Sequence, residues 1–139
     1  MSSGTRSPED MLAEVDLFSG LSRRQVRTLL DRGRTVPHQT GQQVSAEGSG
    51  SLAFHLILDG GATVSVAGTE VRSLGGGDYF GEISMIDGKP RSATVTVTEP
   101  TTTLAIPHQE FERLLSDEPD FARTLLVNLC ARVRDAESR

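Results

Sequence analysis

Residues 80–95 of this chain read FGEISMIDGKPRSATV, and this stretch has the features of a small anion-binding site. Residues 82–86 are long enough for about one turn of helix, and Gly81 precedes them. The first amides of a helix have no intrahelical partner, so a helix that starts after a glycine can bind an anion. Arg91 follows on the next segment, and an arginine can hold a phosphate with two N–H groups. The sequence therefore predicts a site for a small ligand that carries a phosphate.

Short β-prone runs surround this stretch between about residue 35 and residue 106. Gly60-Gly61 indicates a two-residue hairpin, and Gly68-Thr69 indicates another. Many short strands with turn residues between them predict a mainly β fold, an antiparallel β-roll with two sheets in the manner of a jelly roll. The predicted strands span residues 35–38, 43–46, 54–59, 62–67, 70–74, 92–98 and 102–106.

Helical patterns flank the predicted roll on both sides. Residues 9–18 have apolar residues at helical spacing, and Ser22 with Gln25 has the spacing of a capping box for a second helix. Two further helices are predicted within residues 108–136, the second of them starting at Pro119. We expect a disordered lead-in over residues 1–8 and a single domain over residues 9–139.

The last predicted helix has an apolar stripe wider than packing on a barrel requires. A stripe of this width is typical of a surface that binds a second copy or a partner protein. Its members are Phe121, Leu125, Leu126, Leu129, Cys130 and Val133.

Composition narrows the class of protein. The 139 residues carry a net charge of −5, which argues against the basic surface of a DNA-binding protein. Cys130 is the single cysteine, so no internal disulfide is possible and a reducing compartment is expected. No apolar run approaches the roughly 18 residues of a membrane span, and no signal-peptide pattern precedes Met11. We expect a cytoplasmic protein that contacts neither a membrane nor DNA.

The residue pattern does not predict a catalytic or metal-binding site. The three histidines are scattered, without a second ligand at the close spacing that a metal site needs. Ser84 and Ser92 have no neighbouring base in the sequence, and the glycines at 75–77 are not followed by the Lys-Ser/Thr pair of a phosphate-binding loop. Taken alone, Glu82 also fits a first-turn acid favoured by the helix dipole, and Arg91 a surface residue. Together they favour a binding protein for a ribose phosphate, not an enzyme.

Residues 80–95 resemble the phosphate-binding cassette of cyclic nucleotide-binding domains. This family includes the bacterial catabolite activator proteins and the regulatory subunits of cyclic-nucleotide-dependent kinases. The resemblance covers nearly the whole chain from about residue 10, and the family fold is an antiparallel β-roll with helices at both ends. Other matching segments are LFSGLS at 17–22, GQQV at 41–44, FHLILDG at 54–60 and LGGGDYFGE at 74–82.

The resemblance implies roles for the charged and hydroxyl residues of this stretch. Arg91 matches the arginine that binds the cyclic phosphate, and Glu82 matches the acid that accepts from the ribose 2′-hydroxyl. Ser92 matches a side chain that adds a hydrogen bond to the phosphate.

Backbone and apolar contacts are also implied by the resemblance. Gly81, Ile83 and Ser84 match backbone contacts at the cassette helix. Val71 and Leu74 match apolar residues that line the base pocket.

The resemblance implies a stand-alone cyclic nucleotide sensor, with cAMP favoured over cGMP and no metal. Ser92 is compatible with cAMP in bacterial relatives, whereas a hydroxyl residue at this place accompanies cGMP preference in eukaryotic kinases. Ala136 and Glu137 fall where the catabolite activator contacts adenine through hydroxyl side chains. The family's transcription factors continue into a helix-turn-helix domain, whereas this chain stops at Arg139, so DNA binding is not expected.

A second hypothesis is a roll that has lost ligand sensing. It would act as a ligand-independent interaction module and form a homodimer or bind an effector protein through the C-terminal helix.

Overall fold

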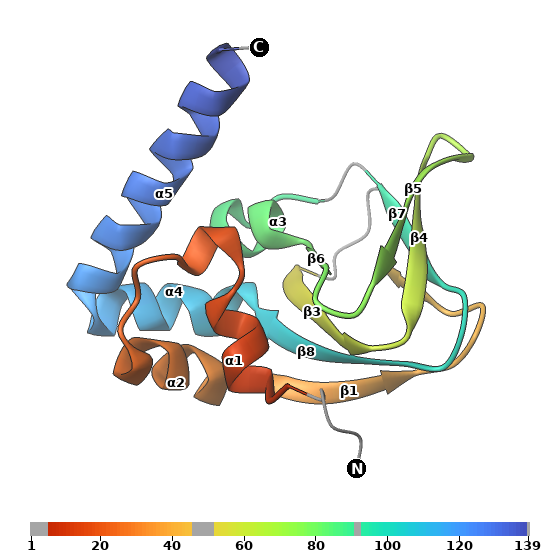
Figure 1. Cartoon of the computed structure of the whole chain (residues 1–139), viewed down its shortest axis with the longest axis horizontal. Helices are drawn as coiled ribbons and strands as arrows, with labels where there is room; N and C mark the ends of the chain where they lie inside the picture. The colour runs from red at the N-terminus through yellow and green to blue at the C-terminus, as the bar shows by residue number, and fades with distance from the viewer. Residues whose placement is uncertain (1–5, 46–51, 91–92, 139) are drawn as a thin grey trace.

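Two four-stranded antiparallel sheets form the body of the protein, and helices gather at one end of them (Figure 1). The computed structural model describes residues 6–45, 52–90 and 93–138. One sheet has the strand order β1 (Arg34–His38), β8 (Thr101–Pro107), β3 (Ala53–Asp59) and β6 (Tyr79–Phe80). The other sheet has the order β2 (Gln43–Ser45), β7 (Thr94–Val97), β4 (Gly61–Val66) and β5 (Thr69–Gly75). The predicted fold class, an antiparallel β-roll with flanking helices, is confirmed.

The helices precede, interrupt and follow the roll. They are α1 (Pro8–Ala13), the short 3₁₀ turn η1 (Asp16–Phe18), α2 (Arg23–Asp31), α3 (Glu82–Asp87), α4 (His108–Asp117) and α5 (Pro119–Glu137). In Figure 1, α3 lies between α5 and the roll, and α5 points away from the body toward the C-terminus. Among the residues that the structure describes between β1 and β8, α3 is therefore the one helix, and it lies where the sequence predicted a site.

The N-terminal helical segment differs from its prediction at both ends. Ser7 caps α1 by accepting from the backbone N–H of Asp10, and Pro8 is in the first turn, so the predicted lead-in contributes to the helix. Val15 has extended backbone angles (φ −69°, ψ 128°). This break divides the predicted helix over residues 9–18 into α1 and η1.

The second helix follows its predicted start. Ser22 Oγ accepts from Gln25 N at 3.1 Å, and Gln25 Oε1 accepts from Ser22 N at 2.9 Å. Both halves of the predicted capping box are therefore present.

Each predicted strand is present, but Gly60-Gly61 does not form the predicted hairpin. β3 pairs with β6 and β8, whereas β4 pairs with β5 and β7. The chain therefore passes from one sheet to the other at Gly60. Gly60 has a φ of 111°, and a Cβ added there would lie 2.3 Å from Thr101 Oγ1. Only a residue without a side chain fits this crossing.

The second predicted hairpin is present, with its loop one residue earlier than expected. Val66 pairs with Thr69, so the loop consists of Ala67 and Gly68. Both loop residues have positive φ, 52° and 81°, as a type I′ turn requires.

Apolar side chains form two cores joined by β6. The core between the sheets contains Ile57, Ala62, Val64, Leu74, Phe80 and Val95. The core under the helices includes Phe18, Phe54, Met85, Phe111, Leu114 and Phe121. Neighbouring side chains on a strand point to opposite faces, so in β6 Phe80 enters the first core and Tyr79 packs against the second. The start of the 80–95 stretch is thus held from both sides.

The apolar stripe predicted on the last helix divides into a buried part and an exposed part. Phe121 and Leu125 are buried, whereas Leu126 is 62% exposed and Val133 57% exposed. Cys130 is also exposed. The first turns of α5 therefore anchor it in the core, and Leu129 is partly buried against the same core, whereas Leu126, Cys130 and Val133 face solvent.

Two buried histidines share one hydroxyl within the first sheet. His38 Nε2 lies 2.9 Å and His55 Nδ1 lies 3.1 Å from Thr103 Oγ1, and the His55 ring stacks on Phe80 with 5.0 Å between ring centroids. His38 Nδ1 has no hydrogen-bond partner among the described residues. Burial lowers the pKa of His38 below the ordinary value of 6.5.

We expect the free energy of unfolding to fall as the pH is lowered from about 7 toward 5. The unfolded chain takes up a proton on His38 more readily than the folded chain, so the stability is complete above the unfolded pKa and is lost below it. Urea unfolding at pH 7.5 and 5.5 measures this loss. In His38→Gln the difference between the two pH values should shrink, and an equal difference in both proteins would contradict the assignment to His38.

Candidate ligand-binding site

A hollow of about 330 Å³ lies against α3 and the strands next to it. This volume is at the lower end of the range of sites for small organic ligands. Val64, Phe80 and Val95 supply apolar wall. The charged residues that line the hollow are the basic Arg72 and Lys89 and the acidic Glu82 and Asp87. The hollow therefore offers both apolar and charged contacts to a ligand.

Gly81 makes the abrupt start of α3 possible. It has φ 83° and ψ 8°, in the left-handed region, and it precedes the first helical residue directly. A residue with a Cβ would cost roughly 1–2 kcal/mol in this conformation. Gly81, Ile83 and Ser84, the predicted backbone contacts, all line the hollow.

The other end of α3 is fixed to α4. His108 Nδ1 donates to the carbonyl oxygen of Met85 at 2.7 Å, and Met85 is fully buried. Gly88 ends α3 with φ 70°, and a Cβ added there would lie 2.8 Å from His108 Nε2. Sequence reasoning missed this role of His108, because its partner is a backbone carbonyl that no spacing pattern marks.

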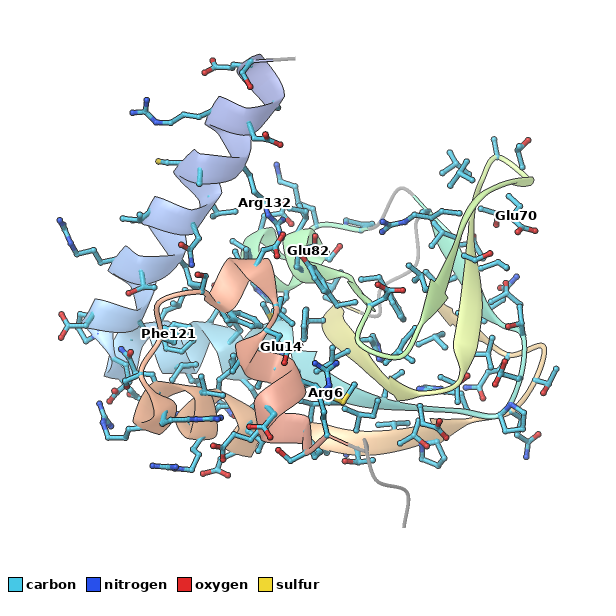
Figure 2. The ribbon with its side chains drawn as sticks, in the orientation of Figure 1. Arg6, Glu14, Glu70, Glu82, Phe121 and Arg132 are labelled. Carbon is cyan, nitrogen blue, oxygen red and sulfur yellow. The ribbon has the colours of Figure 1, made fainter. Side chains whose placement is uncertain are left out.

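Glu82, the predicted ribose acceptor, forms an ion pair with α5. Arg132 Nη1 donates to Glu82 Oε2 at 3.2 Å, and Arg132 Nη2 donates to the hydroxyl oxygen of Tyr79 at 2.8 Å. Figure 2 shows Arg132 and Glu82 beside one another where α5 passes α3. Burial raises the pKa of Tyr79 above 10, which keeps its phenol protonated at neutral pH.

A second hollow of about 270 Å³ adjoins the first and shares Arg72 and Glu82 with it. Leu74, predicted to line the base pocket, lines this second hollow. Val71 is 56% exposed and lines neither hollow. Side chains alternate along a strand, and on β5 the exposed residue Arg72 lines both hollows in place of Val71. The predicted contact of Val71 with a base stays a prediction.

Two residues of the predicted site, Arg91 and Ser92, lie outside the described residues. Their predicted roles at the phosphate remain predictions.

α5 has a second polar attachment one helical turn before Arg132. Asn128 Nδ2 donates to the carbonyl oxygens of Leu17 at 2.7 Å and Ser19 at 2.8 Å. Both amide hydrogens of Asn128 are thus used on the η1 turn. The position of α5 beside α3 is therefore determined by polar contacts as well as by Phe121 and Leu125.

Residues 6–45, 52–90 and 93–138 contain no group of three or more His, Cys, Asp or Glu side chains that could hold a metal ion. No helix in the same segments is long and apolar enough to cross a membrane.

Comparison with known families and curated proteins gives matches over most of the chain. Residues 35–118 match the family model of the cyclic nucleotide-binding domain. A cAMP-dependent protein kinase regulatory subunit from Eremothecium gossypii is 38% identical over 108 residues, which cover 77% of this chain and 24% of that protein. A cGMP-dependent protein kinase from Eimeria tenella is 34% identical over 106 residues, which cover 76% and 11%. The chain spans less than a quarter of the length of these two relatives.

Two solved structures are similar over most of this chain. The N-terminal domain of a transcriptional regulator from Streptomyces coelicolor A3(2) has a TM-score of 0.85 at 24% identity, and the match covers 93% of this chain and 94% of that one. At this identity the similarity supports the fold and nothing more. The Thermus thermophilus catabolite activator protein has a TM-score of 0.72 at 27% identity, covering 88% of this chain and 60% of that one.

Proposed function

This chain belongs to the cyclic nucleotide-binding domain family, and from this premise we propose that it is a stand-alone regulatory module that binds a cyclic nucleotide beside α3. One observation carries the proposal. The hollow of about 330 Å³ is lined by Gly81, Glu82, Ile83 and Ser84, the residues that match the family's cassette helix. In this proposal, Arg91 and Ser92 bind the cyclic phosphate and Glu82 accepts from the ribose.

We propose cAMP as the preferred ligand and cGMP as the competing one. One curated relative is named for cAMP and another for cGMP, so similarity alone does not separate the two. Arg72 lines both hollows. Because a guanidinium can donate to the O6 and N7 acceptors of guanine, Arg72 is the reason to keep cGMP as the second candidate. A direct comparison of the two nucleotides is therefore the central experiment.

The proposed module is regulatory and has no catalytic activity of its own. The cGMP-dependent kinase that it resembles is aligned over only 11% of its length. In the proposal, occupancy of the hollow changes the position of α5, and α5 passes the signal to an effector.

Isothermal titration calorimetry with cAMP and cGMP tests the proposed function. We expect saturable binding of at least one nucleotide, with the tighter one identifying the base preference. Thermal unfolding is an independent measurement, since a ligand at 100 times its Kd stabilises the folded protein by about 2.7 kcal/mol. Absence of binding heat and of a thermal shift with either nucleotide at millimolar concentration would contradict the proposal.

The exposed apolar residues of α5 favour one alternative function. Leu126, Cys130 and Val133 face solvent at helical spacing, which suits a ligand-independent interaction or dimerisation module. A nucleotide-independent dimer in light scattering, lost in Leu126→Gln, together with absent nucleotide binding, would favour this alternative.

A further inference from the structure

We propose that Asp16 is a specificity-determining residue that favours guanine over adenine in the nucleotide ligand and so reduces the preference for cAMP. The proposal rests on the proposed function and concerns the base, whereas Glu82 concerns the ribose. It is carried by one juxtaposition: a carboxylate of η1 and a guanidinium of β5, Asp16 and Arg72, line the same hollow.

The second hollow, of about 270 Å³, is where we expect the base to lie. It adjoins the first hollow and shares with it Glu82, the proposed ribose acceptor. A base attached to that ribose can extend into the second hollow, where Leu74 offers an apolar contact. The hollow is bordered by η1 from the helical end of the molecule and by β5 from the roll (Figure 1). The base can therefore meet side chains from both elements.

Five charged side chains line the second hollow, and three of them have partners within the protein. Arg132 donates to Glu82 Oε2 at 3.2 Å and to the hydroxyl oxygen of Tyr79 at 2.8 Å. Asp78 Oδ2 accepts from the backbone N–H of Gly75 at 2.7 Å. These contacts hold the walls of the hollow together.

The other two charged side chains, those of Asp16 and Arg72, have no such partner. Neither forms a side-chain hydrogen bond or an ion pair with any residue that the structure describes, and both are exposed. In η1 it is the backbone carbonyl oxygen of Asp16 that accepts, from Ser19 N at 3.1 Å, so the turn does not use the carboxylate. One unused acceptor and one unused donor group therefore remain for a ligand.

The charge of Asp16 acts on the same wall of the hollow as the ribose acceptor. Burial raises the pKa of the Tyr79 phenol most, and the negative charges of Asp16 and Glu82 raise it further, against the opposing charge of Arg132. Tyr79 also lines the second hollow. The carboxylate of Asp16 is thus placed beside the hollow and does not simply project into solvent.

Guanine and adenine present different groups to this pair of side chains. Guanine has the O6 and N7 acceptors on one edge and the N1–H and N2–H₂ donors on the next, so Arg72 can donate to the first and Asp16 can accept from the second. Adenine has an N6–H₂ donor in place of O6 and an unprotonated N1 in place of N1–H. A carboxylate that faces N1 of adenine meets a lone pair. Asp16 therefore separates the two bases by attracting one and repelling the other.

The test compares Asp16→Ala with Asp31→Ala by calorimetry with cGMP and cAMP. Asp31 is an exposed acid at the end of α2 and lines neither hollow. We expect the ratio of the Kd for cGMP to the Kd for cAMP to rise about tenfold in Asp16→Ala and to stay unchanged in Asp31→Ala. Removing a negative charge near an anionic phosphate affects both nucleotides alike, so that effect cancels in the ratio. An unchanged ratio in Asp16→Ala would overturn the proposal.

Cyclic IMP isolates the contact with the exocyclic amine, because its base is guanine without the N2 amine. Wild type should bind cGMP more tightly than cyclic IMP, and the difference should largely disappear in Asp16→Ala but persist in Asp31→Ala. If the difference is the same in wild type and Asp16→Ala, the amine is bound by another group and the proposal is wrong.

Asp16→Asn guards against a variant that fails to fold, since it keeps the shape of the side chain and one acceptor oxygen. It should give a ratio between those of wild type and Asp16→Ala, and thermal unfolding checks that each variant is folded. Wild type that binds cAMP but no cGMP at millimolar concentration overturns the role of Asp16 and leaves the proposed function standing. Wild type that binds neither nucleotide overturns the proposed function and this inference with it.

Discussion

Replacing Arg91 by alanine is expected to abolish micromolar binding of cAMP and to leave the fold intact. The resemblance assigns to this side chain the contact with the cyclic phosphate, where an arginine can make a pair of charge-assisted hydrogen bonds. Losing such a contact typically costs about 2–5 kcal/mol, or tens- to thousands-fold in affinity. Calorimetry gives the affinity, and circular dichroism with thermal unfolding shows whether the fold is retained.

Two further variants sharpen this experiment. Arg91→Lys keeps the charge but loses the planar pair of donors, so it should bind between wild type and Arg91→Ala. Arg113→Ala removes an exposed arginine on α4 whose partner is Glu110, and should bind as wild type does. Equal binding by wild type and Arg91→Ala would contradict the assignment of the phosphate to Arg91.

Replacing Gly60 by alanine is expected to cost about 2–6 kcal/mol of folding free energy. A side chain at a φ of 111° is strained by about 1–3 kcal/mol. The added Cβ would also lie 2.3 Å from Thr101 Oγ1 and 2.7 Å from the carbonyl oxygen of Pro100, and relieving such overpacking costs about another 1–3 kcal/mol. Urea unfolding monitored by circular dichroism measures the loss.

Gly68→Ala is the matched control for this crossing. Gly68 also has a positive φ, 81°, but a Cβ added there has nothing within 4 Å. Gly68→Ala should therefore lose only about 1–2 kcal/mol of folding free energy, because the new side chain strains the left-handed backbone. If both variants lose the same stability, the contact between the two sheets at Gly60 is not what requires glycine.

The strands could be predicted from the sequence, but their pairing could not. Each predicted strand is a short β-prone run with turn residues on both sides, so the local pattern was sufficient to predict it. Gly60-Gly61 has the composition of a hairpin and also that of a crossing between sheets. The choice depends on whether β4 pairs with β3 or with β7, which is decided by packing between distant segments. The two-residue strand β6 was too short to give any periodic signal.

The residues of the candidate site also separate into those that the sequence could predict and those that it could not. Gly81 and Glu82 were predictable because the left-handed turn and the first helical turn follow from neighbouring residues. Arg132 was not predictable, because it meets Glu82 only through the packing of α5 against the body. The resemblance implied a base contact for Val71, whereas on β5 it is Arg72 that lines the hollow.

The two hydrogen bonds from Asn128 to the η1 turn attach α5 to the body at one point along its length, and the helix can tilt about this point. Phe121 and Leu125 lie on the buried side of this attachment, and residues 128–137 extend roughly 13 Å on its other side, with Leu129 and Arg132 still in contact with the body. A tilt of about 10° at Asn128 would move the C-terminal end of α5 by roughly 2 Å. If α5 tilts about this attachment, its displacement grows along the helix and is largest at the C-terminal end.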